Sequence, residues 1–328
     1  MAQNFGLRNL AMVMICLGLA ACSGAPVADP AAPESTAPEA ASAPAAPPTE
    51  ERRFEFESYT EVLELFERLQ YTPEAWQEGI REVPRVFITD IPERWRNETT
   101  KQIDVVLKKR LFFRGLAPLV LRANEMILAD RARAQARASE DDAWLLELAR
   151  RYNVLDGDGD SLEAAEYDEL LKRVDIVPVS LALSQGAEES GWGTSRFAAQ
   201  GNALFGQWTW GDNAIKPEQQ REKLGNYGIA AFETPLQSVL AYMHNLNTHR
   251  AYAGLRARRA SMRSAGEALS GRSLAETLDR YSERGVDYVK SLHAIMRVNQ
   301  LDATDAAYLA AGKTIWLVPV GSGGNTAC

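Results

Sequence analysis

Apolar residues recur along most of the chain at the three- and four-residue spacing of amphipathic helices. This spacing predicts helices over 56–70, 141–152, 163–173, 177–190, 234–249, 273–282 and 286–299, and a longer helical stretch over 99–138, interrupted around Gly115 and Pro118. Two short aromatic or β-branched runs, 207–210 and 227–232, are expected to pair as a hairpin. The run 315–320 is expected to pack as a strand. The pattern therefore predicts a mainly α fold with a small β component.

The helix predicted over 177–190 has an apolar face and a glutamate on another face. The apolar face is formed by Ile176, Val179, Leu183 and Ala187. Gly186 has no side chain and is expected to leave space for a ligand beside the carboxylate of Glu189. Gly191 is expected to end the helix, because glycine tolerates the backbone conformation of a helix C-cap. Glu189 is therefore placed in the last turn of a buried helix.

Two effects are expected to raise the pKa of Glu189. The negative end of the helix dipole disfavours another negative charge in the last turn. Trp192, Phe205 and Trp208, folded over the carboxylate, would exclude water from it. A carboxylic acid that stays protonated near neutral pH can donate the proton that glycoside cleavage requires. Glu188 falls on a different side of the helix and is interpreted as a solvated surface residue.

Three separated blocks of sequence carry a resemblance to a known family. The first runs from 189 to 193 and continues with Asn202 and 204–206, the second is 242–252, and the third is 281–285. Over roughly residues 100–300 the chain resembles the glucosaminidases of glycoside hydrolase family 73, and more specifically the Bax subfamily of Gram-negative bacteria. The resemblance implies an α+β lysozyme-like fold, with a helical bundle around an active-site cleft and a small β-hairpin.

The resemblance also implies an activity and a set of site residues. The expected enzyme is a peptidoglycan endo-β-N-acetylglucosaminidase that cleaves the β-1,4 bond following N-acetylglucosamine, with Glu189 as the general acid. Tyr281 resembles the tyrosine that faces the catalytic glutamate, and Tyr288 is its rival for that position. Substrate contacts are expected from Asn202, Phe205, Trp208, Trp192 and Tyr288. For Asn202 the alternatives are that it orients the loop or that it hydrogen-bonds substrate. A second carboxylate could come from Glu218 or Glu222, in the polar stretch of the hairpin, and the retaining or inverting outcome stays open.

Two alternative functions are kept beside this prediction. A muramidase or lytic transglycosylase would use the same kind of fold and a single acid, and its products would differ. A non-catalytic peptidoglycan-binding lipoprotein would belong to another class. The intact motif around Glu189 argues against the binder, because a binding protein has no need of a desolvated acid.

The N-terminus has the pattern of a bacterial lipoprotein. Arg8 precedes an apolar run over 10–20 that is too short to span a bilayer permanently and is typical of a signal peptide. The following residues 19–22 resemble a lipobox, which implies cleavage before Cys22 and acylation of its sulfur. Ser23 is typical of lipoproteins that go on to the outer membrane. The prediction is a lipid-anchored protein that faces the periplasm of a Gram-negative bacterium; the alternative is an ordinary signal peptide.

The sequence then divides into five segments. These are the signal peptide 1–21, the lipidated Cys22 with an Ala/Pro-rich tether over 22–51, a helical N-terminal region 52–150, the glucosaminidase domain 151–310 and a tail 311–328. At roughly 3 Å per residue an extended tether over 24–50 reaches on the order of 80 Å. That reach would let an enzyme on the outer membrane contact the peptidoglycan layer.

Charge argues against two classes of partner. The chain has a formal net charge of −8, which disfavours nucleic acid and a general electrostatic hold on an anionic wall. The basic run Lys108-Lys109-Arg110 could be a wall-binding patch, but we interpret it as a solvated helix face.

No cofactor and no metal are predicted. With Cys22 lipidated, Cys328 is left without a partner. The histidines 244, 249 and 293 lack the spacing of a zinc site, so structural roles are expected for them. The sequence Asp156-Gly157-Asp158-Gly159-Asp160 resembles the start of a calcium loop but is followed by Ser161 and Tyr167 where that loop needs glycine and glutamate. We interpret it as an acidic loop between helices.

Overall fold

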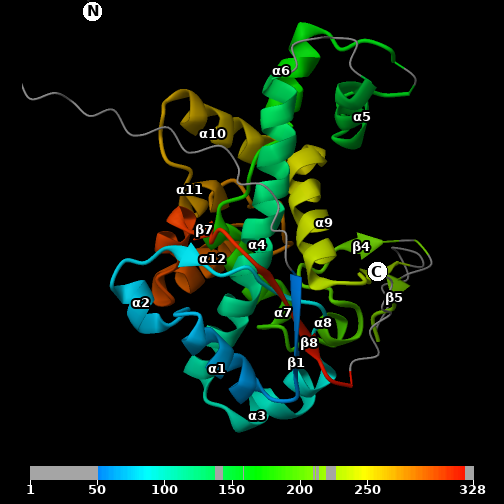
Figure 1. The fold of residues 1–328 in the computed structure, drawn as a ribbon. Helices are drawn as coiled ribbons and strands as arrows, with labels where there is room; N and C mark the ends of the chain where they lie inside the picture. The colour runs from blue at the N-terminus through cyan, green and yellow to red at the C-terminus, as the bar shows by residue number, and fades with distance from the viewer. Residues whose placement is uncertain are drawn as a thin grey trace, which may run out of the picture. The chain divides into compact units, whose positions relative to one another are not determined.

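The computed structural model describes residues 51–136, 143–157, 159–209, 211, 214–218 and 227–321. They belong to one compact unit, and Figure 1 labels its α-helices and several of its strands. The α-helices are α1 (Tyr59–Arg68), α2 (Pro73–Gln77), α3 (Thr100–Gln102), α4 (Val105–Ala136), α5 (Ala143–Arg151), α6 (Ala164–Arg173), α7 (Val179–Ser190), α8 (Arg196–Gly201), α9 (Pro235–Thr248), α10 (Ala253–Ser264), α11 (Gly271–Ala275) and α12 (Val286–Val298). The π-helix η1 (Trp95–Thr99) and the 3-10 helices η3 (Arg250–Tyr252) and η4 (Leu301–Ala306) lie between them. The described chain is mainly helical, as predicted.

Three small sheets accompany the helices. The strands are β1 (Glu51–Phe56), β2 (Glu82–Val83), β3 (Val86–Ile88), β4 (Trp208–Thr209), β5 (Ala214–Ile215), β6 (Gly228–Ala230), β7 (Tyr308–Leu309) and β8 (Thr314–Pro319). The predicted hairpin is confirmed, because β4 pairs antiparallel with β6 and Trp208 lies opposite Ile229. Strand β5 pairs with the other edge of β6, which the sequence did not predict.

The predicted C-terminal strand is confirmed and lies in the centre of a parallel sheet. Strand β8 pairs with β1 on one side and β3 on the other, so the strand order is β1-β8-β3. Figure 1 shows β1 in blue beside β8 in red, although they come from opposite ends of the described chain. Strands β1 and β3 were not predicted, because their pairing partner is more than two hundred residues away.

Helix α4 continues through both positions at which an interruption was predicted. It spans Val105–Ala136 with Pro118 in its interior. An interior proline costs an isolated helix about 3 kcal/mol, since it removes a hydrogen bond and clashes with the preceding turn. Here Pro118 is buried, and α4 packs against α7, α9 and β3. The predicted interruption was wrong because tertiary packing outweighs this local preference.

Most of the other predicted helices are confirmed within a few residues. They correspond to α1, α5, α6, α7, α9 and α12. The helix predicted over 273–282 is shorter, because α11 ends at Ala275 and turns follow. Helix α10 was not predicted. Two of its arginines, Arg256 and Arg259, are buried, so its inward face does not show the apolar stripe by which the other helices were recognised.

Helix α7 is enclosed by the rest of the fold. Of the residues in Val179–Ser190, only Glu188 and Glu189 are not buried. The helix packs against α4, α11, α12 and η4. Asp305 of η4 holds its first turn by accepting hydrogen bonds from the Ser180 amide at 2.8 Å and the Ser180 hydroxyl at 2.9 Å. The two glutamates therefore lie at the end of a helix whose other residues are buried.

The predicted segment boundaries remain predictions, but the described parts of the N-terminal region, the glucosaminidase domain and the tail share one core. Helix α4 from the N-terminal region packs on α7 and α9, and β8 from the tail pairs with β1. The predictions for the signal peptide, the tether and Cys22 concern residues outside the described ranges. Within those ranges, no helix has the length and apolar character that crossing a membrane requires.

Candidate active site

A cleft of about 1430 Å³ is open beside the C-terminal end of α7. Its walls come from α4, α5, α9, the segment 205–208 and the segment 280–284. The residues that matter for the chemistry below are Asp130, Tyr152, Glu189, Phe205, Trp208, His244, His249, Tyr252, Tyr281, Glu283 and Arg284. The cleft thus combines carboxylates with aromatic rings, as carbohydrate sites do.

Glu189 occupies the last turn of α7, as predicted. Gly191 follows as the C-cap with φ of 56°, in the left-handed region that favours glycine. The carboxylate faces Gly206, since a Cβ added there would lie 3.7 Å from Glu189 Oε2. The side chain is partly buried yet lines the cleft. One carboxyl group is therefore fixed at the edge between protein interior and cleft.

A chain of buried hydrogen bonds leads to this carboxylate. The Tyr242 hydroxyl donates to Gln185 Oε1 at 2.7 Å, and Gln185 Nε2 donates to the Tyr288 hydroxyl at 2.9 Å. Tyr288 in turn hydrogen-bonds Glu189. Because its oxygen already accepts from Gln185, the Tyr288 hydroxyl keeps its own hydrogen for the glutamate. Gln185, one turn before Glu189 on α7, thus fixes the direction of the chain.

Burial raises the pKa of Glu189, and this is the largest influence on the group. The Tyr288 hydrogen bond acts in the opposite direction by stabilising the ionised form. Of the two neighbouring charges, Glu188 raises the pKa and Arg284 lowers it. The net direction is upward, which favours a protonated carboxyl group in the cleft. The prediction had attributed the shift to the helix dipole and aromatic cover, and burial is the part that the structure supports.

Tyr281 and Tyr288 were alternatives for the tyrosine that faces the catalytic glutamate, and the structure places them differently. Tyr288 is buried and bonds Glu189, and it is not among the residues that line the cleft. Tyr281 lines the cleft, and its hydroxyl donates to the Phe205 carbonyl at 3.4 Å. The two rings are stacked with centroids 5.4 Å apart, and Tyr252 lies 5.6 Å from Tyr281. One tyrosine therefore contacts the acid, and the other faces the space for substrate.

Of the residues expected to stack on sugars, Trp208 is the one with an available ring. Its side chain is 48% exposed, lines the cleft and stacks on Tyr227 at 4.8 Å. Phe205 also lines the cleft, but it is buried and stacks on Tyr242 at 3.9 Å. Phe205 therefore forms the floor of the cleft and supports the tyrosine that begins the hydrogen-bond chain.

Trp192 does not line the cleft, which disagrees with its expected role in sugar stacking. Its ring packs against Phe112 at 5.9 Å and Phe113 at 5.2 Å, both on α4. Its carbonyl accepts a hydrogen bond from Trp95 Nε1 at 3.1 Å. The backbone has φ of 65° at Trp192, next to left-handed glycines at 191 and 193, and the turn directs the ring toward α4. Trp192 anchors the loop behind the acid.

Asn202 has the first of its two predicted roles. It is buried at the end of α8 with φ of 52°. Its Oδ1 accepts from the Ile91 amide at 2.9 Å, and its Nδ2 donates to the Phe232 and Glu233 carbonyls at 3.2 Å. It does not line the cleft. Asn202 therefore orients the loop that carries Phe205 and does not touch the substrate space.

Two interpretations of α7 were wrong. Gly186 does not leave space for a ligand, because a Cβ there would lie 2.7 Å from Leu116 Cδ2 and 3.5 Å from Phe205 Cε1. It permits close packing of α7 on α4. Glu188 is not a free surface residue either. It pairs with Arg284 Nη1 and accepts from the Ser291 hydroxyl at 2.9 Å, which joins α7 to α12 and to the segment that carries Tyr281.

The prediction that the hairpin stretch supplies a second carboxylate remains a prediction, because most of that stretch lies outside the described residues. Glu218 does not line the cleft; its side chain is 86% exposed and lies 3.8 Å from Arg196. Glu222 lies outside the described residues. The described part of the cleft instead holds Asp130 and Glu283 beside Glu189. Glu283 stands two residues after Tyr281, and this proximity was the sequence signal that could have identified it.

The histidines interact with the backbone. His244 Nε2 hydrogen-bonds the Arg151 carbonyl at 2.7 Å, His293 Nε2 the Arg272 carbonyl at 3.0 Å, and His249 Nδ1 accepts from the Ala251 amide at 3.2 Å. These contacts agree with the structural roles predicted for them. The acidic loop at 156–160 is only partly described, because Asp158 lies outside the described residues.

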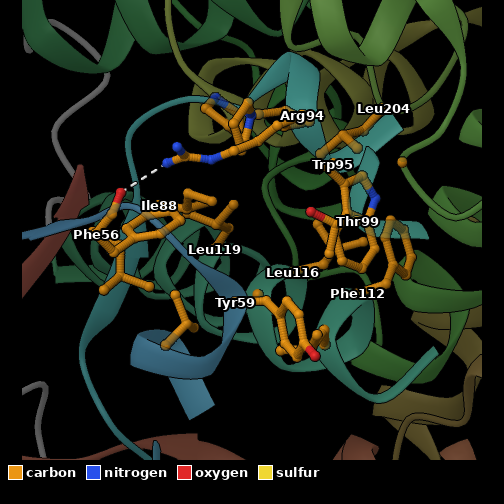
Figure 2. A pocket seen from close by; sticks show the side chains of 18 of the residues that line it. Phe56, Tyr59, Ile88, Arg94, Trp95, Thr99, Phe112, Leu116, Leu119 and Leu204 are labelled. Carbon is orange, nitrogen blue, oxygen red and sulfur yellow. Dashed lines mark hydrogen bonds between the residues drawn. The ribbon is translucent and has the colours of Figure 1, made fainter. Parts of the chain in front are cut away.

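An apolar pocket of about 130 Å³ lies behind the loop that contains Trp192 (Figure 2). It is lined by Phe56, Tyr59, Trp95, Leu116 and other residues, and Arg94 at its edge donates to the Phe56 carbonyl at 2.8 Å. None of the described residues that line it is a carboxylate, so they cannot supply an acid. Of the two spaces, only the cleft has the chemistry of a glycosidase site.

Comparison with known proteins points to the same chemistry. The family described as mannosyl-glycoprotein endo-beta-N-acetylglucosaminidase matches residues 164–301, a range that contains the cleft residues from Glu189 to Arg284. Protein bax of Escherichia coli (strain K12) is 33% identical over 199 residues, which are 59% of this chain and 70% of that protein. No solved structure matches.

Proposed function

Because this chain belongs to the glucosaminidase family as a Bax-type member, it is a glycoside hydrolase, and we propose that it is an endo-β-N-acetylglucosaminidase of peptidoglycan. Its mainly helical structure is that of a lysozyme-like glucosaminidase domain. The proposed reaction is hydrolysis of the β-1,4 bond following N-acetylglucosamine.

The observation that carries the proposal is the position of Glu189. Its carboxyl group lies at the wall of a large aromatic cleft, and burial raises its pKa. Such a group can protonate the glycosidic oxygen while the bond from that oxygen to the anomeric carbon breaks. Water supplies the hydroxyl group that the anomeric carbon gains, and the proton left over restores the acid or passes to solvent.

The neighbouring side chains support the same step. Tyr288 holds the carboxyl group in one orientation and stabilises the carboxylate that remains after proton transfer. Trp208 presents an exposed ring for stacking on a sugar. Tyr281 faces the cleft and can hydrogen-bond the N-acetyl group or stabilise charge at the anomeric carbon.

Two chemical routes complete the cleavage, and variants distinguish them. In an inverting enzyme a second carboxylate activates water across the sugar, and within the described cleft Asp130 and Glu283 are the groups of this kind. In a substrate-assisted route the N-acetyl group of the sugar replaces that carboxylate. Asp130→Asn and Glu283→Gln would each retain activity in the second case.

We further propose that the enzyme is a lipoprotein. Cys22 in its lipobox would carry the acyl chains, and the Ala/Pro-rich tether would let the domain reach the wall from the outer membrane. Labelling of cells with radioactive palmitate tests this directly. Label in the wild-type protein and its loss in Cys22→Ser is the expected result, and label in neither protein would contradict the anchor.

The function is tested by digestion of purified peptidoglycan with the full-length protein in detergent, wild type beside Glu189→Gln. Mass spectrometry should find muropeptides with reducing N-acetylglucosamine from the wild type alone. Circular dichroism of both proteins shows whether the variant is folded.

Other outcomes would assign the alternatives. Reducing N-acetylmuramic acid ends from the wild type alone would indicate a muramidase, and anhydro ends a lytic transglycosylase. Absence of any product from a folded wild-type protein that still sediments with sacculi would favour the wall-binding lipoprotein and contradict the proposed reaction.

A further inference from the structure

A second groove, of about 410 Å³, lies on another side of α7 from the cleft. Val179 and Leu183 of α7 form part of its floor, whereas Glu189 at the end of the same helix lines the cleft. The remaining walls come from α2, α4 and the junction of α12 with η4. Helix α7 is therefore a wall shared by two spaces.

Three cations of α4 line this groove, and no carboxylate of the described residues lines it. They are Lys109, Arg110 and Arg114, and none of them forms an ion pair with another residue in the described part of the chain. Many other arginines of the described residues, such as Arg85 and Arg173, are ion-paired. Unpaired cations that converge on a groove are unexpected in a chain of net charge −8.

Arg114 is the least solvated of the three. Its side chain is half-buried with its guanidinium 5.4 Å from the centre of the Tyr71 ring. Burial lowers the pKa of this guanidinium, and the charge of Arg110 acts in the same direction. Glu74, exposed on α2, is the nearby carboxylate, and its charge acts weakly on both arginines without forming an ion pair with them. An anion in the groove would supply the missing partner.

Apolar side chains cover the rest of the groove. Val105, Val106 and Val298 line it and are 59%, 66% and 67% exposed, although large aliphatic side chains are usually buried. Trp76 and Phe113 add aromatic surface. A purely hydrated anion would not use this surface. The groove fits a ligand that combines carboxylates with small apolar groups.

We propose that this groove binds the acidic stem peptides of peptidoglycan, which rests on the proposed wall substrate. These short peptides carry free carboxylates for the three cations and methyl groups for the valines. Glycan freed of its peptides keeps only the lactyl carboxylate of each N-acetylmuramic acid and has no amino-acid side chains to offer. Lys109 also lies 4.8 Å above the ring of Trp192, so one side chain of the groove contacts the loop that follows the catalytic helix.

The expected consequence is a preference for peptide-bearing glycan. Bound stem peptide would hold a strand against the protein while the neighbouring sugars occupy the cleft. Peptide binding then adds affinity for intact peptidoglycan without taking part in proton transfer at Glu189. Binding to the groove and cleavage in the cleft are therefore separable properties.

The test measures the affinity of the full-length protein for the free stem tetrapeptide by isothermal titration calorimetry at low salt. Arg110→Glu reverses one charge of the groove and should weaken binding about tenfold. Lys108→Glu is the matched control, because it makes the same charge change on the same helix at a position that does not line the groove. The control should stay within about twofold of the wild type. The wild type should bind the tetrapeptide with amidated carboxylates no more tightly than Arg110→Glu binds the unmodified tetrapeptide.

Cleavage is measured separately on intact peptidoglycan and on glycan strands stripped of peptides. Arg110→Glu should slow cleavage of intact peptidoglycan and leave the stripped strands unchanged. Equal loss of peptide affinity in Arg110→Glu and Lys108→Glu would show general charge attraction and overturn the proposal, as would no peptide binding by the wild type. Peptide binding by a wild type that cleaves neither substrate would contradict the proposed hydrolase while leaving the peptide groove supported.

Discussion

The cleft and the groove lie on different sides of α7 and differ in whether their charged side chains have partners within the protein. In the cleft, Glu189 is served by a directed chain of hydrogen bonds through Tyr242, Gln185 and Tyr288, and its neighbour Glu188 is paired with Arg284. In the groove, the cations of α4 have no ionic partner among the described residues. A site that moves a proton needs its own polar groups organised, whereas a site that binds an anion leaves its cations available.

The largest expected effect separates the two regions. Glu189→Gln removes the acid and should lower the rate of peptidoglycan cleavage by roughly 10²–10⁴-fold. Stem-peptide affinity should stay unchanged, because the groove is on another side of α7. Initial rates and calorimetry measure the two properties in the same preparation. A variant that retains a large part of the wild-type rate would exclude Glu189 as the acid.

Tyr288→Phe removes the buried hydrogen bond to the acid at the cleft wall. The hydroxyl stabilises ionised Glu189, so its loss should raise the pKa of Glu189 further. Because the acid works in its protonated form, the basic limb of the pH–rate profile should move to higher pH, and the maximal rate should fall about tenfold as the carboxyl group loses its support.

Tyr281→Phe is the matched control for this shift. The Tyr281 hydroxyl bonds the Phe205 carbonyl, so its removal should leave the position of the basic limb unchanged even where it lowers the rate. Equal shifts of the limb in both variants would contradict the assignment of Tyr288 as the tyrosine that contacts the acid.

Gly186→Ala overpacks α7, the helix that lines both the cleft and the groove, against α4. The added methyl group would lie 2.7 Å from Leu116 Cδ2, and overpacking of this kind lowers the free energy of unfolding by roughly 1–3 kcal/mol. Gly115→Ala in α4 is the control, because a Cβ there meets no atom within 4 Å. It should raise the free energy of unfolding by up to about 1 kcal/mol, since alanine favours a helix interior. Urea unfolding compares the two, and equal stability would show that α7 can shift away from α4.

Glu188→Gln should have the smallest effect. Glu188 raises the pKa of Glu189, so removal of its charge should lower that pKa and move the basic limb to lower pH, opposite to Tyr288→Phe. The side chain is partly exposed and screened, so roughly a few tenths of a pH unit is expected. Ser291→Ala removes a hydrogen bond to Glu188 but no charge and should leave the limb in place. A shift to higher pH in Glu188→Gln would contradict the role of Glu188 as a charge that raises the pKa of Glu189.

Much of the site's framework could be predicted from local sequence. Glu189 lies in the last helical turn and Gly191 ends the helix, because helical spacing and glycine's tolerance of positive φ are local properties. The contacts of Trp192 could not be predicted, since its ring is directed by a turn and received by α4, about eighty residues earlier. Gly186 was misinterpreted for the same reason, because Leu116 comes from that helix too.

By itself, the sequence determined the helical periodicity, the small hairpin, the chemistry of the blocks around Glu189 and the kind of enzyme those blocks resemble. These depend on which residues follow one another along the chain. Only the tertiary structure decided which tyrosine touches the acid, that Asp130 and Glu283 share the cleft with Glu189, and that three cations converge in a second groove. Such outcomes depend on which faces of distant helices meet, and spacing along one segment carries no information about the segment that packs against it.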